Sequence, residues 1–214
     1  MNFTAEQLDP ERCAAAIETT PWALKEWTLV VHALRDGKTC VLIRKGGIHE
    51  PGFAMRATHA VLFPTGFHDG SQPIAPGDGE SRHASRVTGV PVDAAVTVLG
   101  RWRIDSPEQL RAVAPLTPLT STQLETRFAL RPKHALWALL VCPFRLRSPQ
   151  ILPWHRSYGG CRSWVQLDKS TADITPSPFF LAAASCDAAF LAATATTLER
   201  ELGAAVAFSA PSSP

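Results

Sequence analysis

The chain has 214 residues, of which 45% are hydrophobic and 19% charged, and its formal net charge is +2. This composition excludes a fibrous, a membrane-spanning and a wholly disordered chain, because it supplies enough apolar side chains for a core. The near-neutral total identifies no partner. At about 150 residues per domain, the length predicts one domain or at most two small ones.

The ends of the chain and its cysteines give an expectation about location. The first twelve residues contain acidic side chains and no continuous apolar stretch, which is not the pattern of a secretory signal. The longest apolar runs are far shorter than the ~20 residues of a membrane helix. Five cysteines without a CxxC pair indicate reduced thiols and lack the ligand spacing of a zinc site. We therefore expect a cytoplasmic protein without a metal, a cofactor or a membrane contact.

The N-terminal part of the chain contains one helix signal and three strand signals. In chain order, the predicted helix and strands lie at residues 13–19, 27–34, 38–44 and 60–63. The pair Asp36-Gly37 separates the first two strands, and Asp-Gly between apolar runs favours a hairpin. Because both of these strands are apolar on both faces, we expect the hairpin in the middle of its sheet. The third strand is expected to stop before Pro64.

The rest of the chain begins with a loop signal at 69–89, where glycine, proline and small polar residues predict a flexible insertion. The strands and helices predicted after it lie at 94–104, 106–114, 121–128, 135–146, 164–167 and 187–202. Ser106 is expected to cap the first of these helices. Ser121 or Thr122, together with Glu125, forms the expected capping box of the second.

This order of elements lacks alternating strand–helix units and so predicts an α+β fold with a mixed, mostly antiparallel sheet. Short helices and a C-terminal helix complete it, and the strand order also allows a small β-barrel of the PUA type. We expect an N-terminal extension over 1–22, a single α+β domain over 23–205 and a disordered tail over 206–214.

The first candidate binding motif is Arg44-Lys45-Gly46-Gly47, at the end of the second predicted strand. Paired glycines let a backbone approach another group closely, and exposed amides beside two cations suit an anion such as phosphate. The alternative is a solvated turn, because the spacing of a Walker loop is missing.

The second candidate is the long span between Glu125 and Asp168, which contains no acidic residue. It contains seven cations, namely Arg127, Arg131, Lys133, Arg145, Arg147, Arg156 and Arg162, interleaved with six aromatic residues. Basic side chains can hold phosphates while aromatic faces stack bases. The alternative is that the strand aromatics form the core and the arginines a solvated rim, which leaves the loop aromatics Trp154 and Tyr158 for stacking.

Three residues are candidates for catalysis. His49 and His68 could act as an acid, a base or a ligand near neutral pH. Cys161, between a glycine pair and Arg162, could act as a nucleophile with His155. No third orienting residue is identifiable, and the clustered carboxylates of metal-dependent hydrolysis are absent from the sequence pattern. An enzyme is therefore an alternative interpretation.

Several short motifs together resemble the bacterial and archaeal family called domain of unknown function 1802. These motifs are Ala23–Trp27, Leu42–Ile48 with Glu50, Phe63–Thr65 with His68, Arg127-Phe128, Lys133-His134 and Tyr158–Trp164. The similarity runs from about Ala23 to Leu167, and the chain departs from the family pattern at Gly66-Phe67 and in its longer 69–89 loop. The family has no established activity, so the resemblance implies no catalytic residues. Because relatives can be joined to restriction-endonuclease-type domains, it implies restriction-modification or other nucleic-acid processing.

The sequence thus predicts a module that binds DNA or RNA without cutting it. Arg44, Lys45 and the Gly46-Gly47 backbone are expected to hold phosphate. The base or sugar contacts are assigned to Trp154, Arg156, Tyr158 and Arg162, and the two groups are expected to line one concave surface. A small hydrolase or transferase and a protein-interaction module are the alternatives, and the oligomeric state stays open.

Overall fold

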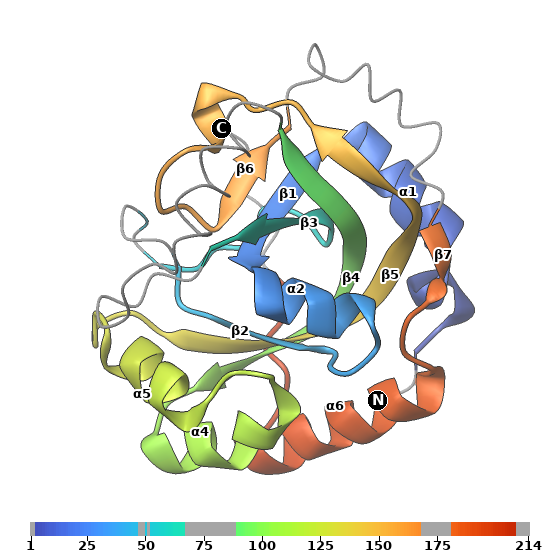
Figure 1. Ribbon diagram of the computed structural model, residues 1–214. Coiled ribbons are helices and arrows are strands. Elements are labelled where there is room, and N and C mark those ends of the chain that lie inside the picture. The colour runs from blue at the N-terminus through green and yellow to red at the C-terminus, as the bar shows by residue number, and fades with distance from the viewer. Residues whose placement is uncertain (1–2, 47–49, 51, 67–88, 168–180, 209–214) are drawn as a thin grey trace.

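The computed structural model describes residues 3–46, 50, 52–66, 89–167 and 181–208 (Figure 1). Its helices and turns are η1 (Ala5–Leu8), α1 (Pro10–Thr19), α2 (Thr28–Arg35), α4 (Pro107–Val113), η2 (Ala114–Leu116), α5 (Ser121–Ala129), η3 (Arg156–Tyr158) and α6 (Ala188–Leu202). Its strands are β1 (Trp22–Trp27), β2 (Val41–Arg44), β3 (His59–Thr65), β4 (Val90–Ile104), β5 (Leu136–Leu152), β6 (Trp164–Gln166) and β7 (Leu181–Ala184). Within these ranges, no helix is long and apolar enough to cross a membrane.

The strands form one mixed sheet. Seven strands are described, paired in the order β2-β5-β4-β3-β1-β6, and β7 pairs with β5 beside this path. β1 and β3 run parallel, and the other pairings are antiparallel. The predicted α+β fold with a mixed, mostly antiparallel sheet and a C-terminal helix is confirmed.

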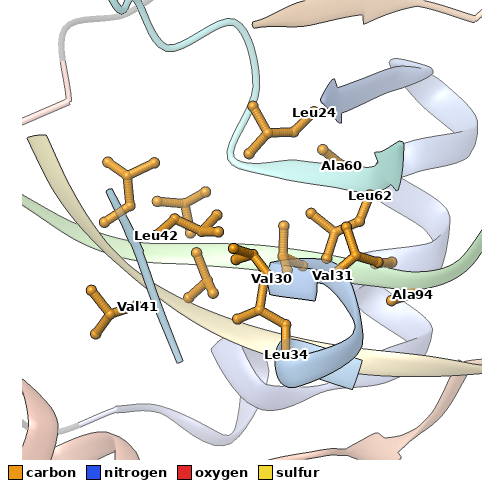
Figure 2. Close-up of a cluster of buried hydrophobic side chains, with 14 of the residues drawn as sticks. Leu24, Val30, Val31, Leu34, Val41, Leu42, Ala60, Leu62 and Ala94 are labelled. Atoms are coloured by element: carbon orange, nitrogen blue, oxygen red, sulfur yellow. The ribbon is translucent and has the colours of Figure 1, made fainter. Parts of the chain in front are cut away.

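The sheet curves around α2, as Figure 1 shows. Figure 2 shows Val30, Val31 and Leu34 of α2 among side chains from β1, β2 and β3, and all three are at most 1% exposed. Burying each such side chain contributes about 1.5–3 kcal/mol. The curvature brings β1 toward β2, although three strands separate them along the pairing path.

The prediction of a strand at 27–34 is wrong, because Trp27 ends β1 and the residues from Thr28 onward form α2. Val30, Val31 and Leu34 are buried while Leu29 and His32 are exposed, which is the period of a helix. The sequence prediction missed this period because the β-branched residues of the segment favour strands. Gly37, with φ +68°, follows the end of the helix and makes no hairpin turn.

The predicted central hairpin is therefore also wrong. Its second strand is reduced to β2, which lies at one end of the pairing path and is paired with β5 in the described part of the chain. The strand that precedes α2 is β1, which the sequence prediction missed. β1 contains the adjacent charges Lys25 and Glu26, and charged residues are depleted in strands.

Most of the other predicted elements are confirmed, with shifted ends. The helices predicted at 106–114 and 187–202 begin after the caps Ser106 and Asp187. The capping box of α5 is wrong in its residues: Thr120 and Gln123 form it, in place of Ser121 and Glu125.

The end of one strand and the presence of another also differ from the prediction. β3 continues through Pro64 to Thr65, because it pairs with β1 there; β4 pairs with β3 only as far as Val61, so the missing N–H of Pro64 breaks no bond to β4. β7 was not predicted.

The N-terminal segment packs on the sheet through α1, where Cys13 and Ile17 are buried. The predicted 69–89 insertion, apart from Gly89, and residues 209–214 of the predicted tail lie outside the described residues.

One glycine in the core gives a stability prediction. A Cβ atom on Gly100 would lie 2.7 Å from a ring carbon of Trp102, which is fully buried. We expect Gly100→Ala to lower the free energy of unfolding by about 1–3 kcal/mol through overpacking, measured by urea denaturation. In a Trp102→Phe chain the smaller ring leaves room, so the same change should cost less there. Equal costs in the two chains would contradict this explanation.

Candidate functional site

The site is built around a buried carboxylate on β1. Glu26, with a side chain only 1% exposed, accepts hydrogen bonds from Arg44 Nη1 at 2.7 Å and Arg127 Nη2 at 3.4 Å. The backbone N–H of Trp27 donates to its Oε1 at 2.8 Å. Burial alone would raise the pKa of Glu26, but the charges of Arg44 and then Arg127 outweigh it and hold the pKa below the ordinary value. Glu26 is therefore a buried anion shared by two cations.

The two arginines tie three parts of the fold together. Arg44 extends from the end of β2, and Arg127 comes from α5. The Arg127 guanidinium stacks on the ring of Trp27 at 3.9 Å and donates to the carbonyl of Ile43 at 2.5 Å. β1, β2 and α5 thus meet at Glu26, and the curvature of the sheet makes this meeting possible.

Lys25 lies on the opposite face of β1, because successive residues of a strand point to opposite sides. Its Nζ donates to the carbonyls of Tyr158 and Gly160, the latter at 3.0 Å, and lies over the ring of Phe63 at 5.6 Å. Burial lowers the pKa of Lys25; the charge of Arg162 also lowers it, whereas those of Cys161 and Glu50 raise it. This lysine holds residues 156–163, called here the 156–163 loop.

Glu50 holds the same loop from its other end. Its two carboxylate oxygens accept from the backbone N–H of Ser163 at 3.0 Å and from the Ser163 hydroxyl at 2.6 Å. Arg131 donates to the carbonyl of Glu50 at 2.5 Å and contacts the ring of His134 at 3.1 Å. The 156–163 loop is therefore fixed at Tyr158, Gly160 and Ser163.

Three side chains of the 156–163 loop face outward. Gly160 has φ +80°, and the Arg162 N–H donates to its carbonyl at 3.1 Å, which makes a tight turn. Arg156, Cys161 and Arg162 are exposed. Neither Cys161 nor Arg162 has a side-chain hydrogen bond or ion pair to any residue that the structure describes. The inner polar network thus holds a loop that presents one thiol and two guanidinium groups.

The predicted phosphate-binding residues point inward. Arg44 and Lys45 are 9% and 8% exposed, and the Lys45 ammonium donates to the carbonyl of Phe128. Gly46 has φ +94°, and a Cβ atom there would lie 2.6 Å from the backbone of Gly52, so the chain closes on itself at this point. Gly47 lies outside the described residues, as do His49 and His68.

The predicted base-contacting residues divide into buried and exposed ones. Tyr158 is 2% exposed, and its ring meets those of Phe63 and Trp154 edge-on, with centroids 5.8 Å and 6.3 Å apart. Trp154 is half-buried, whereas Arg156 and Arg162 are exposed.

Two packed aromatic rings link the predicted groups. The Arg44 guanidinium lies 5.6 Å from the ring of Phe53, which stacks at 6.2 Å on Trp164, directly after the 156–163 loop. The two predicted groups are thus linked by packed side chains, with Arg44 and Lys45 on the inside.

Lys25 and Glu26 are the main residues that the site prediction missed. The signal available was a pair of adjacent charges in a short segment between two tryptophans. Charged side chains are rarely buried unless they are paired, so such a pair inside a strand indicates a specific partner. Across the part of the chain that the structure describes, no three His, Cys, Asp or Glu side chains form a group that could hold a metal ion.

Comparisons with known proteins match the chain to one family model and to solved structures. A family model described as a domain of unknown function, DUF1802, matches residues 23–182. A search of the curated proteins gives no match.

Among solved structures, the chain resembles that of the ASCH protein from Zymomonas mobilis, with a TM-score of 0.45 and 13% identity over 71% of this chain and 90% of that one. A serine-to-alanine variant of that protein gives a TM-score of 0.44 and 13% identity over 72% and 92% of the two chains. A tyrosine-to-phenylalanine variant gives 0.44 and 13% over 75% and 98%.

Proposed function

The chain belongs to the DUF1802 family, whose description assigns no activity, and from its site we propose that it is a nucleic-acid-binding module. The 156–163 loop carries the contact in this proposal, with Arg156 and Arg162 on phosphates. Trp154 supplies a base or sugar contact beside them. Arg44 and Lys45 act from inside the molecule, through their charge.

An excess of positive charge behind the loop is the observation that supports this function best. Among the residues that the structure describes, five cations lie in or against the inner network, namely Lys25, Arg44, Lys45, Arg127 and Arg131. Two carboxylates from the same described residues lie among them, those of Glu26 and Glu50. Buried cations are screened less by salt than exposed ones, so their field reaches the nearby surface.

The pKa values of Lys45 and Arg127 also support the binding of an anion. Burial lowers the pKa of Lys45, and the charge of Arg131 lowers it further. Burial also lowers the pKa of Arg127, where Glu26 opposes the effect and Arg44 adds to it. Burial is the larger cause for both, and a cation that burial disfavours is stabilised by an approaching anion, such as a phosphodiester backbone with its repeated charges.

A titration of labelled oligonucleotides tests the proposal. We expect the full chain to bind single-stranded RNA, single-stranded DNA or duplex DNA at low salt, as measured by fluorescence anisotropy. Arg156→Ala with Arg162→Ala should raise the Kd more than tenfold, because hydrogen bonds to charged groups contribute about 1.5–3 kcal/mol each. The three probes also distinguish RNA from DNA.

A matched control separates the loop from general charge. Arg200 is an exposed arginine on α6, away from the 156–163 loop in Figure 1. Arg200→Ala should leave the affinity nearly unchanged. Loss of binding in this control equal to that in the loop variant would overturn the assignment of the site. Absence of binding to all three probes at low salt would overturn the function. None of the matched proteins supports a role in restriction-modification, and the proposal does not include one.

A further inference from the structure

Two strands meet end to end on one edge of β5, and each contributes a cysteine at the junction. β2 pairs with β5 over Leu140 to Trp137, and β7 pairs with it from Phe144 onward. Both are antiparallel to β5, so β7 and β2 run in the same direction. Cys186 lies two residues after Ala184, the last residue of β7, and Cys40 directly precedes β2.

Backbone hydrogen bonds place both cysteines at the same point of β5. Val141 N–H donates to the carbonyl of Cys40 at 2.9 Å, and Ser185 N–H donates to the carbonyl of Pro143 at 2.8 Å. Cys40 therefore lies beside Val141, and Cys186 lies one residue beyond Ser185, toward Cys40. Chain segments that are distant in the sequence thus bring their thiols together.

Side-chain geometry agrees with the backbone. The Cys186 Sγ lies 3.7 Å from the carbonyl oxygen of Thr39 and 3.8 Å from the carbonyl oxygen of Gly37. The Thr39 carbonyl belongs to the peptide bond that joins Thr39 to Cys40. Each of the two thiols also shifts the pKa of the other, as neighbouring thiols do. Cys40 and Cys186 are 1% and 4% exposed, and a Cβ atom on Gly37 would lie 2.2 Å from the carbonyl oxygen of Ser185, so this contact is tight.

We propose that Cys40 and Cys186 form a reversible disulfide when the chain meets a peroxide, which joins β7 covalently to β2. The four residues of β2 lie at the end of the strand order and end in Arg44, so the bond would fasten an edge strand of the site-bearing sheet.

The chemistry consumes one peroxide per disulfide. The Cys40 sulfur attacks a peroxide oxygen, so that an S–O bond forms, the O–O bond breaks and, with hydrogen peroxide, one water leaves. The Cys186 sulfur then attacks the resulting sulfenic acid; an S–S bond forms, the S–O bond breaks and a second water takes up the thiol proton. The two thiols lose two electrons, and the peroxide gains them.

The pair differs from the other three cysteines. Hydrogen bonds from Cys186 and Thr194 lower the pKa of Cys40, which favours it as the attacking thiol, while its bond to Cys40 and burial raise the pKa of Cys186. Burial raises the pKa of Cys13 and of Cys142 to about 12. Cys161 is exposed on the 156–163 loop, so it is oxidised independently.

Thiol counting in a Cys161→Ser chain tests the proposal. The full chain has five cysteines, so this variant has four. After treatment with hydrogen peroxide, denaturation and alkylation with N-ethylmaleimide, we expect two alkylated cysteines, Cys13 and Cys142. Mass spectrometry of a non-reduced digest should contain a linked Cys40–Cys186 peptide that dithiothreitol removes. The oxidised chain should melt about 5–10 °C above the reduced one, because the bond closes a long loop.

Two results would overturn the proposal. One is four alkylated cysteines after peroxide treatment; the other is a linked peptide that involves Cys13 or Cys142. The added variant Cys40→Ser should lose both the linked peptide and the rise in melting temperature. Since the thiol count needs only the Cys161→Ser chain, a folding defect in the Cys40 variant leaves the test intact.

Discussion

We expect Glu26→Ala to lower the free energy of unfolding by about 3–5 kcal/mol. The substitution leaves the guanidinium groups of Arg44 and Arg127 close together in the interior without their shared carboxylate. Removing one partner of a buried ion pair costs about 3–5 kcal/mol of stability, because the other charge stays buried without compensation. The measurement is urea denaturation of the full chain at neutral pH, followed by a fluorescence or circular-dichroism signal.

An exposed ion pair supplies the matched control for this variant. Glu108 pairs with Arg111 at 2.6 Å on α4, where both side chains are more than half exposed. Glu108→Ala should change stability little, because solvent and salt screen such pairs. Equal losses of stability in the two variants would contradict the description of Glu26 as the buried centre of the site.

The same carboxylate predicts a dependence of stability on pH. The pKa of Glu26 is lower in the folded chain than its ordinary value of 4.5. As pH falls below 4.5, the unfolded chain takes up the proton first, so the stabilisation by Glu26 is complete above this pH and is lost as pH falls toward the folded pKa. The slope of stability against pH should be smaller for Glu26→Gln than for the wild type in this range, and equal slopes would contradict the prediction.

Lys25→Met should cause the second large effect, a loss of about 2–4 kcal/mol. Methionine fills a similar volume but makes neither of the hydrogen bonds of Lys25 to the carbonyls of Tyr158 and Gly160, and losing the donor to a buried polar group costs about 1–3 kcal/mol. Urea denaturation measures the loss. Amide hydrogen exchange should also become faster in the 156–163 loop, since its central anchor is gone.

Lys38→Met serves as the control for Lys25, because Lys38 is exposed beyond the end of α2. It should change neither the stability nor the exchange of the loop amides appreciably. Unchanged exchange of the loop amides in Lys25→Met would show that Glu50 alone holds the loop.

Local signals in the sequence accounted for much of the fold. Ser106 caps the helix that it was expected to cap, the predicted helix at 187–202 is α6, and the apolar run from Ala135 predicted most of β5. The segment at 27–34 was misread because β-branched residues favour strands, whereas burial follows the helical spacing of Val30, Val31 and Leu34. In this segment, the burial of one face of the helix outweighed the local preference for a strand.

The site could be predicted only in part, for a reason that lies in the curvature of the sheet. The acid-free span led to the 156–163 loop with its exposed Arg156 and Arg162. The partner of Arg44 could not be found, because Glu26 lies on a strand that approaches β2 only when the sheet curves. Sequence spacing contains no information about such a contact, so Arg44 was expected on the surface.

The salt dependence of oligonucleotide binding tests the central claim most directly. Each phosphate contact that a protein makes adds about 0.7–0.9 to the slope of log Kd against log salt, because neutralised phosphates release counterions. We expect a steep slope for the wild type and a slope smaller by about 1–2 for the chain with Arg156→Ala and Arg162→Ala. A wild-type slope near zero, or one that the two substitutions leave unchanged, would contradict phosphate binding by the 156–163 loop.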